Sequence, residues 1–213
     1  MKHMKRQSVP KNWPVPRKGT AFVARPISGE IPILVVLRDM IKIANNRKEV
    51  KKALHMNNIL INGKSVKEDK IGVSLFDIVT IVPSKKNYII DLKQNGKFTI
   101  EEIDEKNVGH KVAKVIDKKV LKGKKTQLNL SDGNNFLSDL KCKTNDSVVI
   151  DFKTKKPIKC LDLKEKANVI IFAGKHAGKK GVIEKLIPER KMAKLKIGEN
   201  SINVLIKQLM VTE

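Results

Sequence analysis

The chain has 213 residues, of which 45 are lysine or arginine and 22 are aspartate or glutamate, so its formal net charge is +23. This balance predicts a polyanionic partner, because a strongly positive chain repels itself and attracts nucleic acid. The excess is spread along the chain: residues 1–29 carry seven basic and no acidic residues, and residues 164–213 carry eleven against five. A basic tail on a neutral enzyme would instead concentrate the charge at one end.

The sequence also disfavours several other classes of protein. No run approaches the roughly 20 consecutive apolar residues of a membrane-spanning helix. The basic start is followed by polar, proline-containing sequence and not by the apolar core of a signal peptide. We therefore expect a cytoplasmic protein with no membrane partner. The only cysteines, Cys142 and Cys160, lack the spacing of a zinc site, and a cytosolic disulfide is also disfavoured. One Trp and one Tyr are too few for base stacking to be the main binding device.

Residues 1–30 contain four prolines, scattered basic residues and no apolar periodicity. We expect an extended basic N-terminal tail that does not order by itself. Its candidate RNA contacts are Lys5, Arg6, Lys11, Trp13, Arg17 and Lys18. Two interpretations of Trp13 stay open: the ring stacks on a base or enters a neighbouring molecule, or it packs against the first folded domain, since Trp is usually buried.

Residues 31–83 predict a module of two helices and a hairpin. The run 31–44 is apolar and has Pro32 in its first turn, which is typical of a helix start. A second helix is expected from Arg47 to about residue 56. Asn62-Gly63 predicts a tight β-hairpin turn, and residues 76–82 predict a further strand.

The second predicted helix carries the first candidate RNA surface. Its N-terminus offers backbone N–H groups and the positive end of the helix dipole beside Arg47 and Lys48, which is a natural phosphate site. Helical spacing and the adjacent hairpin are expected to bring Arg47, Lys51, Lys52 and Lys64 onto one face. The alternative is that these residues form only a solvated helix face.

Three parts of this segment match a known module: Arg38-Asp39, the stretch 46–50 and the stretch 61–64. They resemble the small RNA-binding module shared by a bacterial small-subunit ribosomal protein, some pseudouridine synthases and tyrosyl-tRNA synthetases. The resemblance implies that the loop-to-helix junction and the hairpin form one basic face that holds RNA backbone. It adds Arg38 and Asn62 to the candidate contacts.

Beyond residue 83 the sequence changes to short alternating segments, which predict a central β domain over 84–164 and a second β domain over 165–213. The expected strands of the central domain are 88–92, 97–103, 111–121, 126–130, 147–152 and 159–163. Those of the last domain are 168–172, 181–187, 193–197 and 202–206.

The glycine-rich stretch 174–183 resembles the KOW motif of ribosomal proteins and transcription elongation factors, a loop between two strands of a small SH3-like barrel. Glycines there allow positive φ and close backbone approach. The candidate RNA contacts are Gly174, Lys175, His176, Gly178, Lys179 and Lys180. A dinucleotide fingerprint and a Walker loop are rejected, because the glycine spacing and the residues after Gly178-Lys179 do not fit them. A plain hairpin without RNA contact stays open.

Taken in order, the Pro-Lys-x-Trp tail, the stretch 31–39, the helix-pair module, the central β domain and the KOW segment resemble the S-four-e family of archaeal and eukaryotic small-subunit ribosomal proteins. The resemblance implies an α+β, mainly β protein that is a structural constituent of the small ribosomal subunit in the cytoplasm. Its expected partners are small-subunit rRNA and neighbouring ribosomal proteins. No metal, cofactor, small-molecule substrate or homo-oligomer is expected.

Two rival functions use the same modules. An RNA-modification enzyme would need a catalytic domain beside the helix pair. Residues 84–164 are lysine-rich and interrupted by turns, which disfavours an active-site pocket that excludes water. The four histidines are isolated in sequence and no nucleophile motif occurs, so we expect no enzyme. A free transcription factor built on the KOW segment would be expected to expose an apolar polymerase-binding surface, and none stands out in the sequence.

Overall fold

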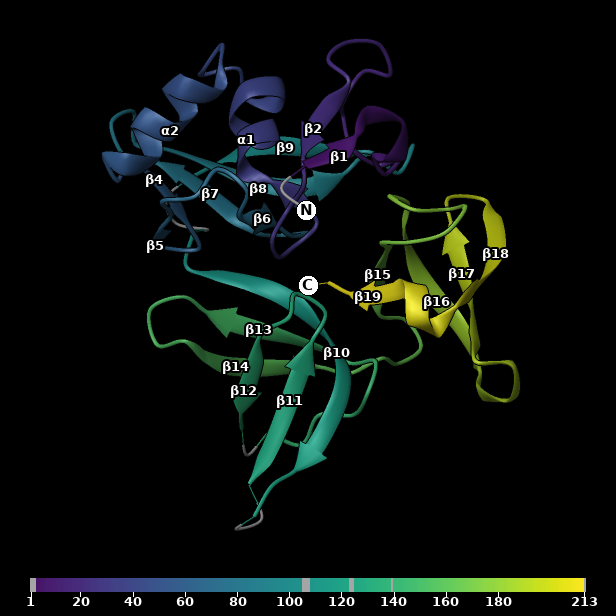
Figure 1. The fold of residues 1–213 in the computed structure, drawn as a ribbon. Coiled ribbons are helices and arrows are strands. Elements are labelled where there is room, and N and C mark those ends of the chain that lie inside the picture. Colours follow the sequence, from purple (N-terminus) through teal and green to yellow (C-terminus); the bar gives the residue numbers. More distant parts are fainter. Residues whose placement is uncertain (1–2, 105–107, 123–124, 139, 213) are drawn as a thin grey trace. The chain divides into compact units, whose positions relative to one another are not determined.

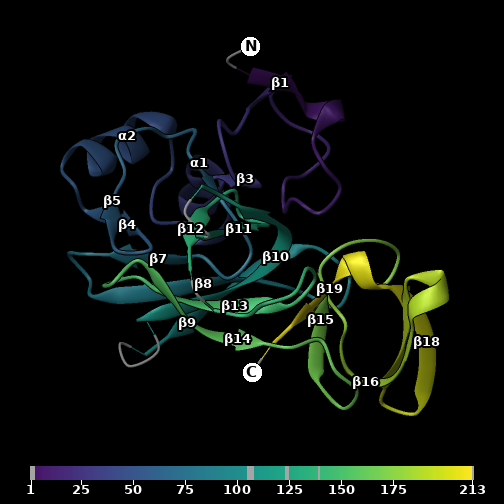
Figure 2. The ribbon, with the colours of Figure 1, turned by 90° about the horizontal axis from the view of Figure 1, so that it is seen from below.

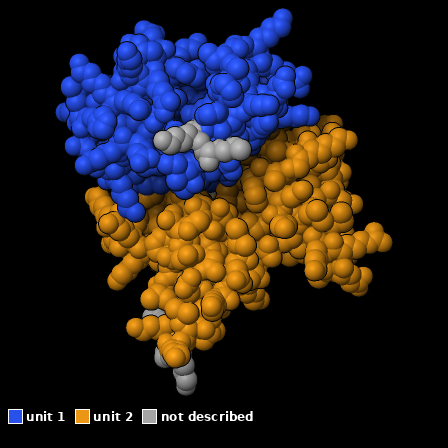
Figure 3. Space-filling view, viewed as in Figure 1, with its two compact units in different colours: residues 1–91, 97–108 blue, residues 92–96, 109–213 orange. Residues whose placement is uncertain are grey.

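The computed structural model describes residues 3–104, 108–122, 125–138 and 140–212. Within these residues the chain is mainly β, as the sequence predicts, with three five-stranded sheets and two two-stranded sheets (Figure 1). The chain divides into two compact units, coloured separately in Figure 3. Unit 1 comprises residues 1–91 and 97–108, and unit 2 comprises residues 92–96 and 109–213. None of the helices in the described residues is long and apolar enough to cross a membrane.

The apolar run of unit 1 forms α1 (Ile33–Val35), followed directly by a π-helical turn, η2 (Val36–Met40). The helix expected over 31–44 is therefore too long at both ends. Ile31 and Pro32 form strand β3 (Ile31–Pro32), which pairs with β6 (Gly72–Val73). Lys42 has a φ of 62°, a left-handed conformation in which the helix cannot continue.

The second helix, α2 (Arg47–His55), begins and ends close to where the sequence predicts. Asn46 caps it, since its side-chain oxygen accepts a hydrogen bond from the Glu49 N–H at 3.0 Å. The Glu49 carboxylate in turn accepts from the Asn45 N–H at 2.7 Å, a reciprocal arrangement close to a capping box. Val50 and Leu54 are buried, so the opposite face of the helix is left to solvent.

A five-stranded sheet with the order β5-β4-β7-β8-β9 lies beside the two helices in unit 1 (Figure 1). Its strands are β4 (Ile59–Ile61), β5 (Lys64–Ser65), β7 (Ile78–Ile81), β8 (Lys86–Leu92) and β9 (Phe98–Ile103). The domain boundary expected at residue 83 falls inside this sheet, because β8 pairs antiparallel with β7. Residues 82–85 are a tight turn, in which Lys85 has a φ of 53°, and they are no linker.

The N-terminal segment is ordered, which corrects the expectation of an extended tail. Strands β1 (His3–Lys5) and β2 (Phe22–Ala24) form an antiparallel pair. Between them, Trp13 is only 3% exposed, and the Phe98 N–H donates to the Asn12 carbonyl at 2.9 Å. The segment orders because it buries Trp13 against the rest of unit 1, a long-range contact that local composition does not reveal.

The central sheet belongs to unit 2 and has the order β12-β11-β10-β13-β14. Its strands are β10 (His110–Val120), β11 (Thr126–Leu130), β12 (Asn135–Leu137), β13 (Ser147–Asp151) and β14 (Lys156–Leu161). Val115, Leu128 and Val148 lie at the centre of its apolar cluster, where Cys142 and Cys160 also pack. Both cysteines are free thiols. Cys160 lies on β14, whereas Cys142 lies in the loop before β13.

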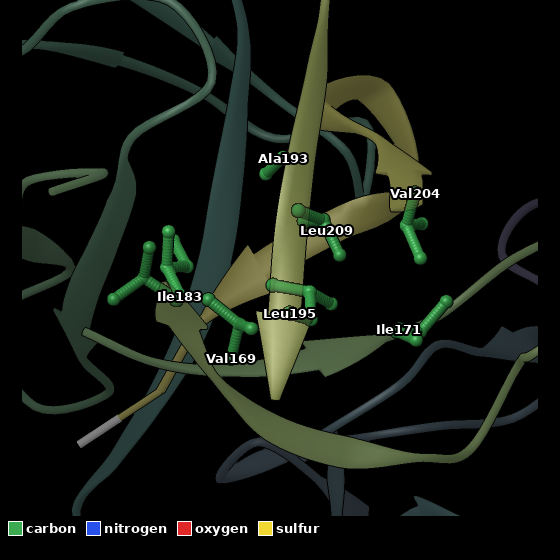
Figure 4. Packing of buried hydrophobic residues seen from close by; sticks show 8 residues of the cluster. Val169, Ile171, Ile183, Ala193, Leu195, Val204 and Leu209 are labelled. Carbon is green, nitrogen blue, oxygen red and sulfur yellow. The ribbon is translucent and has the colours of Figure 1, made fainter. Parts of the chain in front are cut away.

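The C-terminal sheet of unit 2 has the order β18-β17-β16-β15-β19, and Figure 2 shows it in green-yellow to yellow. Its strands are β15 (Asn168–Ile171), β16 (Lys180–Ile187), β17 (Met192–Ile197), β18 (Asn200–Leu205) and β19 (Leu209–Val211). The last strand returns to pair with the first, Val169 opposite Val211. Figure 4 shows Ile183, Leu195 and Leu209 converging in the core that these strands enclose.

Two buried lysines of β10 belong to the interior of unit 2 and not to its binding surface. Lys111 forms an ion pair with Asp132, and both side chains are buried. The Lys114 ammonium donates to the carbonyls of Ile206, Lys207 and Leu209 at 2.6, 3.1 and 2.7 Å. Burial lowers the pKa of Lys114 to about 8. The Lys114 contacts join the central and C-terminal sheets through hydrogen bonds.

Candidate nucleic-acid interface

The outer face of α2 presents four basic side chains. Arg47, Lys48, Lys51 and Lys52 are all exposed, and Lys64 is exposed at the start of β5. The backbone N–H groups at the helix N-terminus are less available than the sequence suggested. Asn46 accepts from one of them, and the Glu49 carboxylate lies in the first turn, where it already provides a negative charge. The charge of this face therefore comes from its side chains more than from the helix dipole.

The two arginines of this region are anchored to carboxylates. Arg47 pairs with Asp69 through Nε, and its second nitrogen lies 3.3 Å from the other carboxylate oxygen. Arg38 makes a two-bond contact with Asp39, at 2.9 and 2.7 Å. These bonds orient the guanidinium groups and partly compensate their charge. The lysines of α2 are therefore its better candidates for contact with phosphates.

Asn62 has an internal role. It adopts a φ of 51° beside Gly63 at 75°, as a two-residue hairpin turn requires. Its amide donates to Asp77 at 2.8 Å and accepts from the Ile78 N–H at 2.9 Å. These bonds hold the turn against β7, so the Asn62 side chain is already used within unit 1 and Lys64 is the group that the turn presents.

The glycine loop between β15 and β16 has the conformation that its glycines allow. Gly174 and Gly178 have φ values of 89° and 85°. The Gly178 N–H donates to the Ile171 carbonyl at 2.7 Å, which closes the loop. A Cβ at Gly178 would lie 1.7 Å from the Lys93 carbonyl oxygen. The close approach at Gly178 is therefore made by the protein backbone of unit 2, and the groups left for a phosphate are the side chains of the loop.

Those side chains differ in exposure. Lys175 and Lys180 are exposed, whereas His176 and Lys179 are half-buried. In the N-terminal segment Lys5, Lys11, Arg17 and Lys18 are exposed. Trp13 is buried, which favours the interpretation that its ring packs within unit 1. Arg6 is half-buried, and its guanidinium bonds to Pro16 and Thr20.

One group of side chains in the described residues has metal-ligand chemistry. Donor atoms of Asp146, Cys160 and Asp162 lie within 4.8 Å of one another. The Asp146 carboxylate accepts from the N–H groups of Lys143 and Leu163, at 2.8 and 2.9 Å, and Asp162 pairs with Lys164 at 2.6 Å. Burial raises the pKa of the Cys160 thiol, which favours its neutral form. The group serves as a hydrogen-bonded support for the loop before β13.

Sheet order and surface together define a mainly β, strongly basic protein with a small helical element in its first unit. Comparison with known proteins finds matches to ribosomal proteins along the chain. Residues 1–29 match the RS4NT (NUC023) domain, and residues 84–157 match Ribosomal family S4e. The chain is 33% identical to the small ribosomal subunit protein eS4 of Methanocella arvoryzae, covering 86% of this chain and 80% of that protein. It is 36% identical to the eS4 protein of Methanospirillum hungatei, with 87% and 80% covered.

The fold is similar to the crystal structure of the 30S ribosomal protein S4e from Thermoplasma acidophilum. The TM-score is 0.73 at 21% sequence identity, over 85% of this chain and 93% of that one. The chain belongs to the ribosomal S4e family, as the sequence motifs predicted.

Proposed function

We propose that the protein is a structural constituent of the small ribosomal subunit in the cytoplasm, where it binds rRNA and neighbouring ribosomal proteins and catalyses no reaction. The observation that carries the proposal is membership of the S4e family, whose relatives over most of the chain are small-subunit proteins. The net charge of +23 supports it, because such a chain is stabilised by a polyanionic partner.

RNA contact on this proposal is made mainly with the phosphate backbone. The basic residues proposed for it are exposed or half-buried, and they lie on several elements. They are Lys5, Lys11, Arg17 and Lys18 in the first segment, Lys48, Lys51, Lys52 and Lys64 in the helix module, and Lys175, Lys179 and Lys180 in the glycine loop. Lysine on a flexible stem acts as a point charge, which suits backbone neutralisation without base recognition.

The finer architecture is part of the same proposal. The strand order β18-β17-β16-β15-β19, in which the last strand of the chain pairs with the first strand of this sheet, supports an SH3-like KOW barrel. The positive φ values at Gly174 and Gly178 support a KOW loop. Helix α2 with the β4–β5 hairpin supports the RNA-binding helix-pair module.

Sedimentation of the tagged, full-length protein from a lysate tests the function. We expect recovery with the small subunit in a gradient at low salt, and retention there at salt concentrations that remove adventitious basic proteins. Recovery with polymerase, or at the top of the gradient at both salt concentrations, would instead favour a free RNA-binding factor.

A further inference from the structure

Unit 1 contains a cavity of about 260 Å³ that is lined by β1, β2, the first helix and the start of α2. Its apolar wall includes Val23, Leu34 and Val35, all buried. The volume is slightly below the roughly 300–1,000 Å³ of sites for drug-sized ligands. The cavity is therefore large enough for one small group and not for a larger molecule.

Three arginines line this cavity: Arg6, Arg38 and Arg47. Arg6 donates to the carbonyls of Thr20 and Pro16, each at 2.6 Å, and to the Thr20 hydroxyl at 2.8 Å. These acceptors are neutral, so they fix the guanidinium without cancelling its charge. Arg38 and Arg47 are oriented by Asp39 and Asp69. The cavity thus has a preformed site for an anion, centred on Arg6.

An aromatic ring completes the lining. Phe22 is 54% exposed although it lies on strand β2, and it contacts His3 edge to face with ring centroids 4.6 Å apart. A large ring held at this exposure beside arginines offers a stacking surface to a planar partner. Sequence reasoning found Arg6, Arg38 and Arg47 singly, but it missed Phe22 and His3.

The geometry points to a binding site for one nucleotide turned out of an RNA chain, an inference that rests on the proposed RNA-binding function. Its phosphate contacts Arg6, and its base enters the cavity between Phe22 and the apolar wall. A fully paired duplex keeps its bases stacked and cannot fill such a site, whereas a bulged or looped nucleotide can. A bare phosphate would leave the apolar wall exposed to water.

Binding of two short RNA duplexes tests the inference, one with a single bulged adenosine and the other fully paired. The full-length protein is measured as wild type, Phe22→Ala, Phe22→Tyr and Ile27→Ala. Ile27 is the matched control, since it is 65% exposed in the same unit and does not line the cavity. Trp13 is the only Trp and is buried in unit 1, so its fluorescence checks that each variant keeps the fold.

We expect Phe22→Ala to lower affinity for the bulged RNA by about tenfold and to change affinity for the paired duplex by less than about twofold. Phe22→Tyr should restore the preference for bulged over paired RNA, and Ile27→Ala should leave that preference intact. Equal loss on both RNAs, or no loss, would overturn the nucleotide site while RNA binding itself stands. If neither RNA bound, the proposed function would fail as well. Competition by adenosine monophosphate as effective as that by the bulged RNA would assign the site to a free nucleotide and overturn the RNA assignment.

Discussion

Units 1 and 2 carry their positive charge on different side chains. Five of the six arginines lie in unit 1, and Arg190 is the only one in unit 2, where lysine supplies nearly all the positive charge. Arg6, Arg38 and Arg47 are held by carboxylates or carbonyls around one cavity. The lysines of the glycine loop lie on a backbone that is itself fixed, with Gly178 against Lys93. Anchored guanidinium groups suit recognition of one geometry, and lysines on flexible stems suit neutralisation of phosphates wherever they lie.

Gly178→Ala is expected to have the largest effect. The new Cβ would lie 1.7 Å from the Lys93 carbonyl oxygen, at a φ of 85° that disfavours any side chain. We expect a loss of about 2–4 kcal/mol in the free energy of unfolding, measured by urea denaturation. Gly63→Ala is the control, since φ there is 75° but nothing lies within 4 Å, and it should cost only about 1–2 kcal/mol. Equal losses would show that the close approach to Lys93 contributes nothing.

Lys114→Met removes the buried ammonium that bonds three carbonyls. We expect a loss of about 1–3 kcal/mol below pH 8, because three charge-assisted hydrogen bonds to backbone carbonyls are lost. Burial lowers the pKa of Lys114 to about 8 from its unfolded value near 10.5. Between these values the unfolded chain binds more protons, so this group makes the wild type more stable as pH rises from 8 to 10.5. Wild type and Lys114→Met showing the same change across that window would rule out this role of Lys114.

Reversing charge on the α2 face tests phosphate binding in unit 1. Lys51→Glu with Lys52→Glu should lower RNA affinity by about tenfold and leave the thermal unfolding midpoint nearly unchanged, since both side chains are exposed. The slope of log affinity against log salt should become shallower by about 0.7 to 0.9 for each phosphate that the variant no longer neutralises. Lys67→Glu with Lys70→Glu supplies a control of equal charge change in the same unit. If this control variant lowered RNA affinity by the same factor, the effect would come from net charge and not from the α2 face.

The smallest effect should come from Arg47→Lys, which keeps the charge and removes the forked contact with Asp69. We expect an unchanged salt slope and about threefold weaker binding to bulged RNA, because a lysine does not hold the same geometry. Lys175→Arg in unit 2 should change neither quantity. If both substitutions behaved alike, the distinction between the two units would not hold.

Local signals in the sequence predicted much of this structure. Strand β11 has the predicted bounds, and α2 and the Asn62-Gly63 turn lie where the sequence predicts them, because helical spacing and turn chemistry involve near neighbours. Strands β12 and β19 were missed, because three residues are too few to show a period. The β1–β2 hairpin depends on burial of Trp13, and the cavity depends on packing between residues 3–24 and 34–47. Contacts between segments that are distant in the sequence cannot be predicted from local composition.

Ultraviolet crosslinking in purified small subunits, followed by mass spectrometry of the RNA-linked peptides, tests the proposed RNA-binding role most directly. We expect RNA crosslinks at Phe22, in α2 around Lys51, and in the glycine loop at Lys175 or Lys180. Subunits that contain the protein but give RNA crosslinks only in other segments, with none at these three places, would contradict that role.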